Sequence, residues 1–382
     1  MSFALLALIC AVALLGPLLS ATRRLRLPVV VGELGVGIVL GMTGLRVLDA
    51  TNPTFEFMGQ IGFALVMFIA GAHLPIRNQA LVKGLGRGAS RAVAIGVLSV
   101  PAGFGLAWAF GTGHGPLYAV LLASSSASLV LPAMAGADLG GHDALEFLAQ
   151  LAIADAACIV LLPLAINPTR AGSAAIGALA VLVTGAVLLV ILLLAGRKGR
   201  AERLHEFSQR RLLALELRIT LLVLFVLAAV AVSTGVSVML AGFVAGLVFA
   251  AIGEHNRVQH QLFAISEGFF APIFFVWLGA SLDLRNLASH PAAILLGLSL
   301  GLGALILHTV VGVVSRQPWP LAGLTAAQLG VPVGAVALGS EAGLLHPGEG
   351  SALLLGAVVT IVGVAMLAGR ARRTLGASPA QA

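Results

Sequence analysis

Long runs of apolar residues follow one another along almost the whole chain, and short charged or turn-forming clusters separate them. A helix that crosses the hydrocarbon core of a bilayer, about 30 Å thick, needs about 20 predominantly apolar residues. Runs of this length recur from residue 3 to residue 369. The pattern therefore predicts an all-α polytopic membrane protein.

The separators divide the chain into about thirteen predicted transmembrane spans. The spans are residues 3–21, 27–45, 55–75, 90–110, 115–136, 145–166, 172–195, 212–232, 236–252, 262–281, 291–314, 319–343 and 350–369. An alternative for the first run is a cleaved secretory signal peptide, which carries basic residues in front of it. Here Arg23, Arg24 and Arg26 follow the run instead, which favours an uncleaved first helix.

Composition agrees with this picture and excludes other classes of protein. Of the 382 residues, 59% are hydrophobic and 10% are charged, whereas about a quarter of a soluble domain is charged. The net charge of +7 does not indicate a nucleic-acid binder, because the basic residues lie in the gaps between apolar runs. Cys10 and Cys158 lie far apart without a CxxC spacing, so we expect buried free thiols. No cofactor is expected.

Basic residues are distributed unequally between alternate gaps. Of the 22 Lys and Arg residues, 18 lie in one set of gaps. The other set holds Arg46, Arg170 and Arg285, and Arg218 lies within a span. Loops rich in Lys and Arg stay in the cytoplasm. The N-terminus is therefore predicted outside, and the C-terminus, with a short tail at 371–382, inside.

The chain also resembles itself at a nearly constant offset. The segment GAHLPIR, which starts at Gly71, is similar to GASLDLR, which starts at Gly279, 208 residues later. GIVL at Gly37 returns as GLVF at Gly246, 209 residues later. Corresponding spans are seven apart, an odd number, so the two copies would cross the membrane in opposite directions. Such inverted-topology repeats are typical of secondary transporters.

The repeat suggests how residues 1–370 are organised as one transmembrane exchange domain. Its halves would be residues 3–166 and 212–369, with 172–195 as a linker helix. The same offset places Ser126, in span 115–136, on Gly334, in span 319–343.

Small residues and proline interrupt these two spans. Ser125 and Ser126 stand in the first span, and Pro332 and Gly334 in the second. They predict two helices broken near the midplane, whose freed carbonyls can face a cation. The alternative is that these residues only allow neighbouring helices to approach closely.

One carboxylate, Asp155, lies about half-way along an apolar span, 145–166. Inserting an unpaired charge there costs on the order of 3 kcal/mol, so intramembrane acids usually mark functional sites. A proton or a monovalent cation can neutralise the carboxylate, and competition between the two is antiport in its simplest form. The alternative is a protonated carboxyl group that bonds to a neighbouring helix.

Other polar groups within the spans are less specific. His308 lies mid-span in 291–314, where it can pair with Asp155 or serve as a structural histidine. Glu33 and Glu341 lie towards span ends and are expected as structural or mouth charges, with an accessory role in the ion path as the second interpretation. No nucleotide loop, catalytic triad order or resident metal motif is present in the sequence, which points away from an enzyme.

Together these landmarks resemble the monovalent cation:proton antiporter superfamily, in particular its bacterial branch with sodium/proton antiporters and potassium-efflux systems. The resemblance covers nearly the whole chain, with its best segments LPVVVGELGVGIVLG from Leu27, FIAGA from Phe68 and PIFFVWLGASLD from Pro272. It implies a homodimer in the bacterial cytoplasmic (inner) membrane, in which a six-helix core moves against a dimer-forming panel. It further implies that two broken helices cross beside Asp155, which binds Na⁺ or K⁺ transiently and H⁺ in turn.

The chain departs from the family pattern near this site. Family members generally carry Asp, Asn or Gln where this chain has Ala154, and a single carboxylate favours one-for-one exchange. They often have Lys or Arg at the position of His308, and a polar segment where this chain has Val333 and Ala335. Two other functions stay open: a sodium-coupled organic-solute carrier on a similar scaffold, and a membrane component without transport activity.

Overall fold

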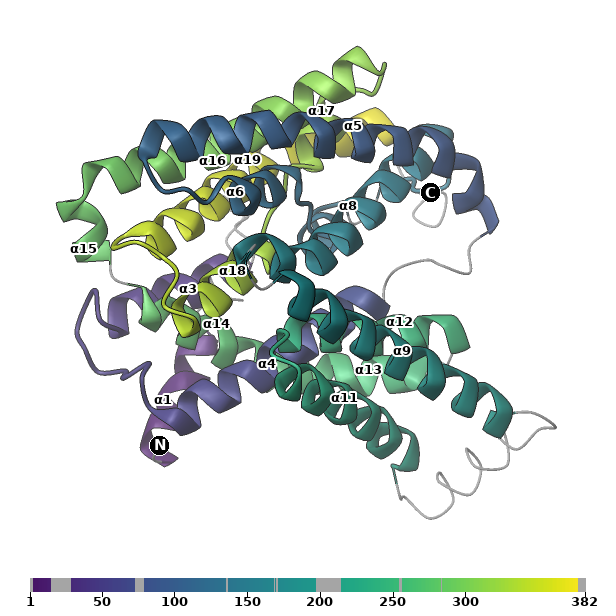
Figure 1. The fold of residues 1–382 in the computed structure, drawn as a ribbon. Helices are drawn as coiled ribbons and strands as arrows, with labels where there is room; N and C mark the ends of the chain where they lie inside the picture. Colours follow the sequence, from purple (N-terminus) through teal and green to yellow (C-terminus); the bar gives the residue numbers. More distant parts are fainter. Residues whose placement is uncertain are drawn as a thin grey trace. The chain divides into compact units, whose positions relative to one another are not determined.

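The computed structural model describes residues 3–14, 29–72, 79–134, 137–167, 169, 171–196, 214–253, 256–282 and 284–376. Within these ranges the chain forms helices and turns, without a β-strand (Figure 1). The helices are α1 (Phe3–Ala13), α3 (Val29–Leu40), α4 (Pro53–Ala72), α5 (Gln79–Phe110), α6 (Gly115–Ala123), α7 (Ala127–Ala133), α8 (His142–Ile166), α9 (Ala171–Gly196), α11 (Leu215–Ser233), α12 (Val238–Ile252), α13 (Asn256–Ile265), the π-helix η3 (Ser266–Phe270), α14 (Ala271–Ser281), α15 (Leu284–Ser289), α16 (Pro291–Val314), α17 (Trp319–Leu324), α18 (Gly330–Glu341) and α19 (Glu349–Leu375).

The helices confirm the prediction of an all-α membrane protein. Each predicted span contains a helix or an interrupted helix among the described residues, and eight helices are long and apolar enough to cross a membrane. The number of crossings remains a prediction. Residues 15–21 of the first span, the basic cluster at 23–26 and the tail from residue 377 lie outside the described residues.

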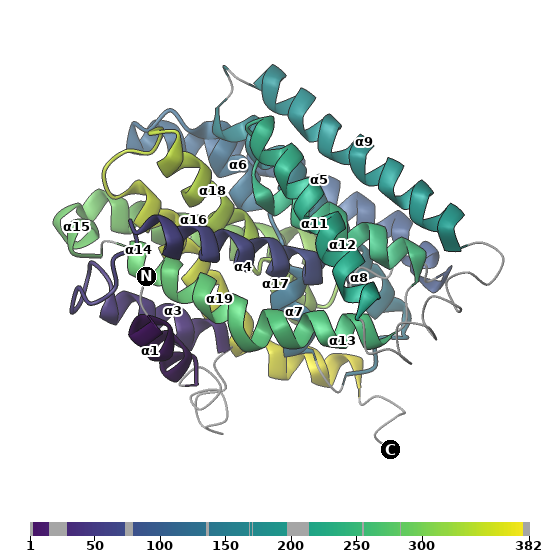
Figure 2. The same ribbon diagram turned by 90° about the horizontal axis from the view of Figure 1, so that it is seen from below.

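The contacts divide the chain into two compact units. The first comprises Met1–Cys10, Asn52–Arg77 and Gly172–Phe275, and the second comprises Ala11–Thr51, Asn78–Ala171 and Val276–Ala382. In the first unit α4 packs along α12 (Figure 2). A Cβ atom on Gly71 would lie 2.3 Å from the carbonyl oxygen of Phe243, and one on Gly246 would lie 2.2 Å from that of Phe68. Only glycine permits this approach of the two backbones.

A matching crossing joins α3 to α14 within the second unit. A Cβ atom on Gly37 would lie 2.4 Å from the carbonyl oxygen of Val276, and one on Gly279 would lie 2.3 Å from that of Leu34. The sequence repeat pairs Gly37 with Gly246 and Gly71 with Gly279. Exchanging the two halves of the sequence therefore turns one crossing into the other, which supports an internal repeat.

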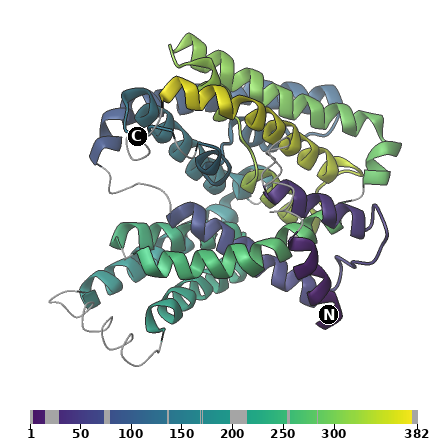
Figure 3. The ribbon, with the colours of Figure 1, turned by 180° about the vertical axis from the view of Figure 1, so that it is seen from behind.

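The second unit shows the same relation among its longer helices. Helices α5, α6 and α8 pack against one another, and so do α16, α17 and α19, whose close pairing is visible in Figure 3. In chain order α16, α17 and α19 are the counterparts of α5, α6 and α8. The exposed faces of α5 and α16 carry large apolar side chains such as Phe104, Trp108 and Ile306, as a surface in contact with lipid requires.

Both predicted helix breaks occur, but the second is displaced. Residues 124–126 separate α6 from α7, whereas residues 325–329 separate α17 from α18. Pro332 lies in the first turn of α18, where a missing N–H removes no hydrogen bond. Pro332 and Gly334 are therefore not the interruption, and the predicted correspondence of Ser126 with Gly334 is wrong by several residues.

Candidate functional site

Asp155 lies on α8 with only 5% of its surface exposed. Its Oδ2 accepts a hydrogen bond of 3.0 Å from the backbone N–H of Ala127. Ala127 is the first residue of α7, directly after the first break. N–H groups in the first turn of a helix lack helical partners and carry partial positive charge, so they stabilise a carboxylate. The first broken helix thus presents its second half to Asp155.

Asp155 has no basic partner in the part of the chain that the structure describes. Ala154, which precedes it, is buried and offers no side-chain ligand. A buried carboxylate without a counter-charge is stable only if a cation or a proton neutralises it. This arrangement suits reversible binding of a small cation.

The three serines of the first break are buried. Ser125 donates a hydrogen bond of 2.6 Å from Oγ to the backbone carbonyl of Thr325, which lies in the second break. Ser124 donates to the carbonyl of Leu121, one turn earlier. Ser125 thus joins the two breaks, and the predicted role of Ser125 and Ser126 in ion binding remains a prediction.

His308 occupies a different place from the one expected. The ring is fully buried, its Nε2 lies 3.0 Å from the carbonyl of Leu122, and its Nδ1 lies 2.9 Å from the hydroxyl of Thr325. Since a carbonyl only accepts, Nε2 carries a hydrogen and donates it. Both ring nitrogens therefore have partners in or beside the breaks. Of the two interpretations of His308, these contacts favour the structural histidine over a direct pairing with Asp155. His308 instead stabilises a carbonyl that the first break deprives of a helical partner.

Three polar residues complete this network, and the sequence interpretation missed them. Gln328 donates to the carbonyl of Leu121 at 2.6 Å, and Gln150 donates to the hydroxyl of Thr325 at 3.2 Å. Oε1 of Gln150 is buried and has no partner among the described groups, so it can accept from water or bind a cation. The available signal was the presence of Gln150, Thr325 and Gln328 in otherwise apolar spans.

The remaining predicted residues are dispersed. Glu33 is buried on α3, and the described contacts do not connect it to Asp155. Glu341 ends α18, and its side chain lies outside the described ones. Val333 and Ala335 are buried apolar residues of α18. The accessory role of Glu33 and Glu341 in the ion path remains a prediction.

Two broken helices joined through Ser125, the first of which contacts a buried carboxylate, are an architecture typical of secondary transporters. The fold is that of a sodium proton antiporter, MjNhaP1 from Methanocaldococcus jannaschii. One structure of MjNhaP1 covers 97% of this chain and 98% of its own, with a TM-score of 0.62 and 18% identity. An electron-microscopy structure of MjNhaP1 covers 98% of both chains, with a TM-score of 0.65 and 16% identity.

The model of the family described as sodium/hydrogen exchanger, transmembrane, matches residues 10–369. The chain therefore belongs to the sodium/hydrogen exchanger family, a family of membrane transporters.

Curated relatives agree with this family. The chain is 24% identical to a putative Na⁺/H⁺ antiporter, YjbQ, of Bacillus subtilis, over 94% of this chain and 62% of the relative. It is 28% identical to the glutathione-regulated potassium-efflux system protein KefC of Enterobacter, over 72% of this chain and 44% of the relative. It is 25% identical to the Na⁺/H⁺-K⁺ antiporter GerN of Bacillus cereus, over 70% of this chain and 68% of the relative. The chain thus spans less than two thirds of the first relative and less than half of the second.

Proposed function

We propose that the protein exchanges Na⁺ or K⁺ for H⁺ across the bacterial cytoplasmic membrane by alternating access. One observation carries the proposal: Asp155 is buried beside a helix break and has no basic partner among the described residues. Its charge must then be neutralised by the bound cation or by a proton. Binding of one displaces the other, which couples the two fluxes.

Each neighbouring group has a separate role in this cycle. The N–H of Ala127 orients the carboxylate at the start of α7. Ser125, His308 and Gln328 donate to carbonyls in or beside the two breaks and so maintain the interrupted backbone. Ser126, in the first break, and the buried Oε1 of Gln150, on the same helix as Asp155, are the candidates to add ligands. With one carboxylate in the site, the exchange is one cation for one proton.

The choice of ion rests on the relatives. Their names include a Na⁺/H⁺ antiporter, a potassium-efflux protein and a Na⁺/H⁺-K⁺ antiporter. Both Na⁺ and K⁺ are therefore substrates to be tested.

Contacts between span ends agree with the predicted alternation of sides, whereas the proposed direction, with the N-terminus outside and the C-terminus in the cytoplasm, rests on the charge count. His114 and Glu349 come from two gaps that charge counting places outside, and they form an ion pair. Arg91, at the start of span 90–110, and Ser315, directly after span 291–314, lie at span ends assigned to the cytoplasm, and they form hydrogen bonds. Each contact thus joins two span ends that are predicted on the same side of the membrane.

A homodimer is part of the proposal. Helix α9, the predicted linker, is apolar along its whole length, and most of its large side chains are exposed. A lipid bilayer or a second copy can cover such a face.

The decisive experiment measures cation-driven proton movement in proteoliposomes. Addition of Na⁺ or K⁺ should shift the internal pH with unchanged protein, and Asp155→Asn should abolish the response, at least about 100-fold. Asp143→Asn is the matched control, because Asp143 is an exposed acid in the first turn of the same helix and should leave exchange unchanged.

Other outcomes reject antiport. Uptake of an organic solute driven by Na⁺, without proton movement, would identify a sodium-coupled carrier. Equal behaviour of unchanged protein and Asp155→Asn in every flux assay would identify a component without transport activity.

A further inference from the structure

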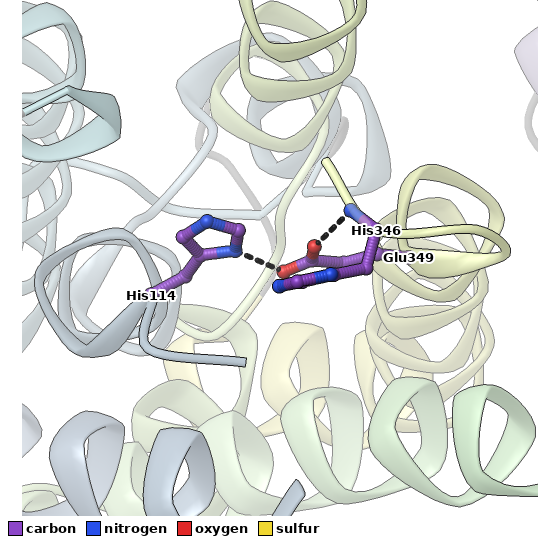
Figure 4. A group of neighbouring side chains, drawn as sticks. All are labelled: His114, His346 and Glu349. Carbon is purple, nitrogen blue, oxygen red and sulfur yellow. Dashed lines mark hydrogen bonds and ion pairs between the residues drawn. The ribbon is translucent and has the colours of Figure 1, made fainter. Parts of the chain in front are cut away.

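A second group of titratable side chains lies outside the Asp155 site: His114, His346 and Glu349 (Figure 4). His114 directly precedes α6, His346 lies in the turn between α18 and α19, and Glu349 is the first residue of α19. Each side chain offers one possible ligand atom, a ring nitrogen or a carboxylate oxygen, and these three atoms lie within 4.8 Å of one another. Residues distant in sequence thus bring two imidazoles and one carboxylate together.

The carboxylate of Glu349 is held in a fixed orientation. The residue is 2% exposed, and its Oε1 accepts a hydrogen bond of 2.5 Å from the hydroxyl of Tyr118. Oε1 also lies 2.7 Å from Nδ1 of His114, and Oε2 accepts from the backbone N–H of His346 at 2.8 Å. Ligands of metal ions are typically oriented by hydrogen bonds of this kind.

The imidazole of His346 is exposed but also tethered. Its Nε2 lies 3.2 Å from the carbonyl of Thr112, in the turn that leads to α6. Because a carbonyl only accepts, Nε2 carries the hydrogen, and Nδ1 keeps a lone pair. A histidine ligand usually has this arrangement, with one nitrogen bound to a carbonyl and the other free for the metal.

We propose that His114, His346 and Glu349 bind a divalent transition-metal ion of the zinc type. Two imidazole nitrogens and one carboxylate oxygen form a common zinc donor set, which leaves a fourth position for water. Around a tetrahedral zinc ion, donors at about 2.0–2.1 Å from the metal lie about 3.3 Å apart. To reach this spacing the 2.7 Å between Nδ1 of His114 and Oε1 of Glu349 has to widen, and the other separations, which are at most 4.8 Å, have to adjust through the exposed His346 side chain. The ion replaces the proton that His114 and Glu349 share.

The proposed metal would connect two elements that belong to the transport core. His114 starts the first half of the broken helix, and Glu349 starts α19, which packs against α16 and α17. Binding would therefore stabilise this end of the second unit against thermal unfolding, because the metal binds the folded arrangement only.

The test measures zinc binding by the full-length protein, purified with a tag that contains no histidine. Calorimetric titration with ZnCl₂ should show one saturable site per chain, and Co²⁺ should give the absorption of a tetrahedral complex. His114→Ala and His346→Ala should each weaken binding at least about 100-fold, more than the 10–100-fold that follows loss of a residue that only orients a ligand. Tyr118→Phe, which removes such a residue, should fall within that smaller range.

His142→Ala is the matched control. His142 is exposed and lies 2.9 Å from another buried carboxylate, Glu146, but Arg87 and Arg91 also contact that carboxylate and would repel a cation. This variant should bind zinc as the unchanged protein does, and zinc should raise the Tm of both. Absence of saturable binding, or unchanged affinity in His114→Ala and His346→Ala, would overturn the proposal. No ion flux is measured, so the result is independent of antiport.

Discussion

Helix α8 carries two buried carboxylates, Glu146 and Asp155, whose surroundings differ completely. They are about 14 Å apart along the helix axis, at 1.5 Å per residue. Glu146 lies 2.9 Å from Arg91 and 3.2 Å from Arg87, and His142 contacts it as well. Asp155 has one backbone N–H and no basic partner among the described residues.

The difference supports the proposal that Glu146 is a structural acid and Asp155 an exchangeable one. Arg91 is itself buried, stays protonated at all physiological pH values, and is bound in addition to Ser315. It supplies Glu146 with a permanent counter-charge that no solution cation can displace. Asp155 lacks such a partner, so its counter-charge comes from a mobile ion or a proton. Burial alone therefore does not mark an ion site, and it is the absence of a fixed partner among the described residues that supports the proposal for Asp155.

The largest expected effect is on stability, at Glu146. In Glu146→Gln the buried guanidinium of Arg91 loses its counter-charge, and the free energy of unfolding should fall by about 3–5 kcal/mol. Asp155→Asn should not destabilise the protein, because a buried amide needs no counter-charge. Unfolding of both variants in mixed detergent and SDS micelles measures the difference.

Replacing both partners sharpens this test. In the double variant Arg91→Met, Glu146→Met no buried charge remains, so it should be more stable than Glu146→Gln. If Glu146→Gln unfolds like the unchanged protein, or Asp155→Asn is the less stable of the two, the contrast between the carboxylates is wrong.

The apolar pattern was sufficient to predict the fold but not the local geometry of the site. Span positions follow from the length and polarity of the runs, and the repeat pairs Gly37 with Gly246 and Gly71 with Gly279, although only the structure shows that helices cross at these glycines. The importance of Asp155 follows from its cost within an apolar helix. These features are local or repeat along the chain, so a single sequence contains them.

The remaining details depend on partners that are distant in sequence. Pro332 and Gly334 weaken a helix, yet the second break lies at 325–329, where Ser125 supplies a donor for a freed carbonyl. The partners of His308 likewise come from Leu122, far away along the chain, and from Thr325. No periodicity contains such information, which is why the sequence left two interpretations of His308 open, a pairing with Asp155 and a structural histidine, of which the contacts favour the second.

A smaller effect is expected from the neutral network that surrounds the break beside Asp155. In His308→Leu the carbonyl of Leu122 loses the donor that replaces its helical partner. One unsatisfied buried acceptor costs about 1–3 kcal/mol, so unfolding should become easier by this amount, less than for Glu146→Gln. The same micellar unfolding measures it. His308→Gln retains a donor and should recover part of the loss; equal stability of His308→Leu and unchanged protein would contradict the capping role.

The smallest effect is expected at Arg87, the second arginine of Glu146. Its side chain is 71% exposed, so solvent and salt screen its attraction for the carboxylate, which Arg91 already neutralises. Arg87→Ala should reduce the free energy of unfolding by less than about 1 kcal/mol, and the loss should shrink as salt concentration rises. If Arg87→Ala lost as much stability as Glu146→Gln, the buried guanidinium of Arg91 would not by itself neutralise the carboxylate of Glu146. Arg87 and Arg91 contact the same carboxylate, but only Arg91 is buried. Comparing the stability loss in Arg87→Ala with that in Glu146→Gln therefore shows how far burial of the partner, rather than proximity alone, makes a counter-charge permanent.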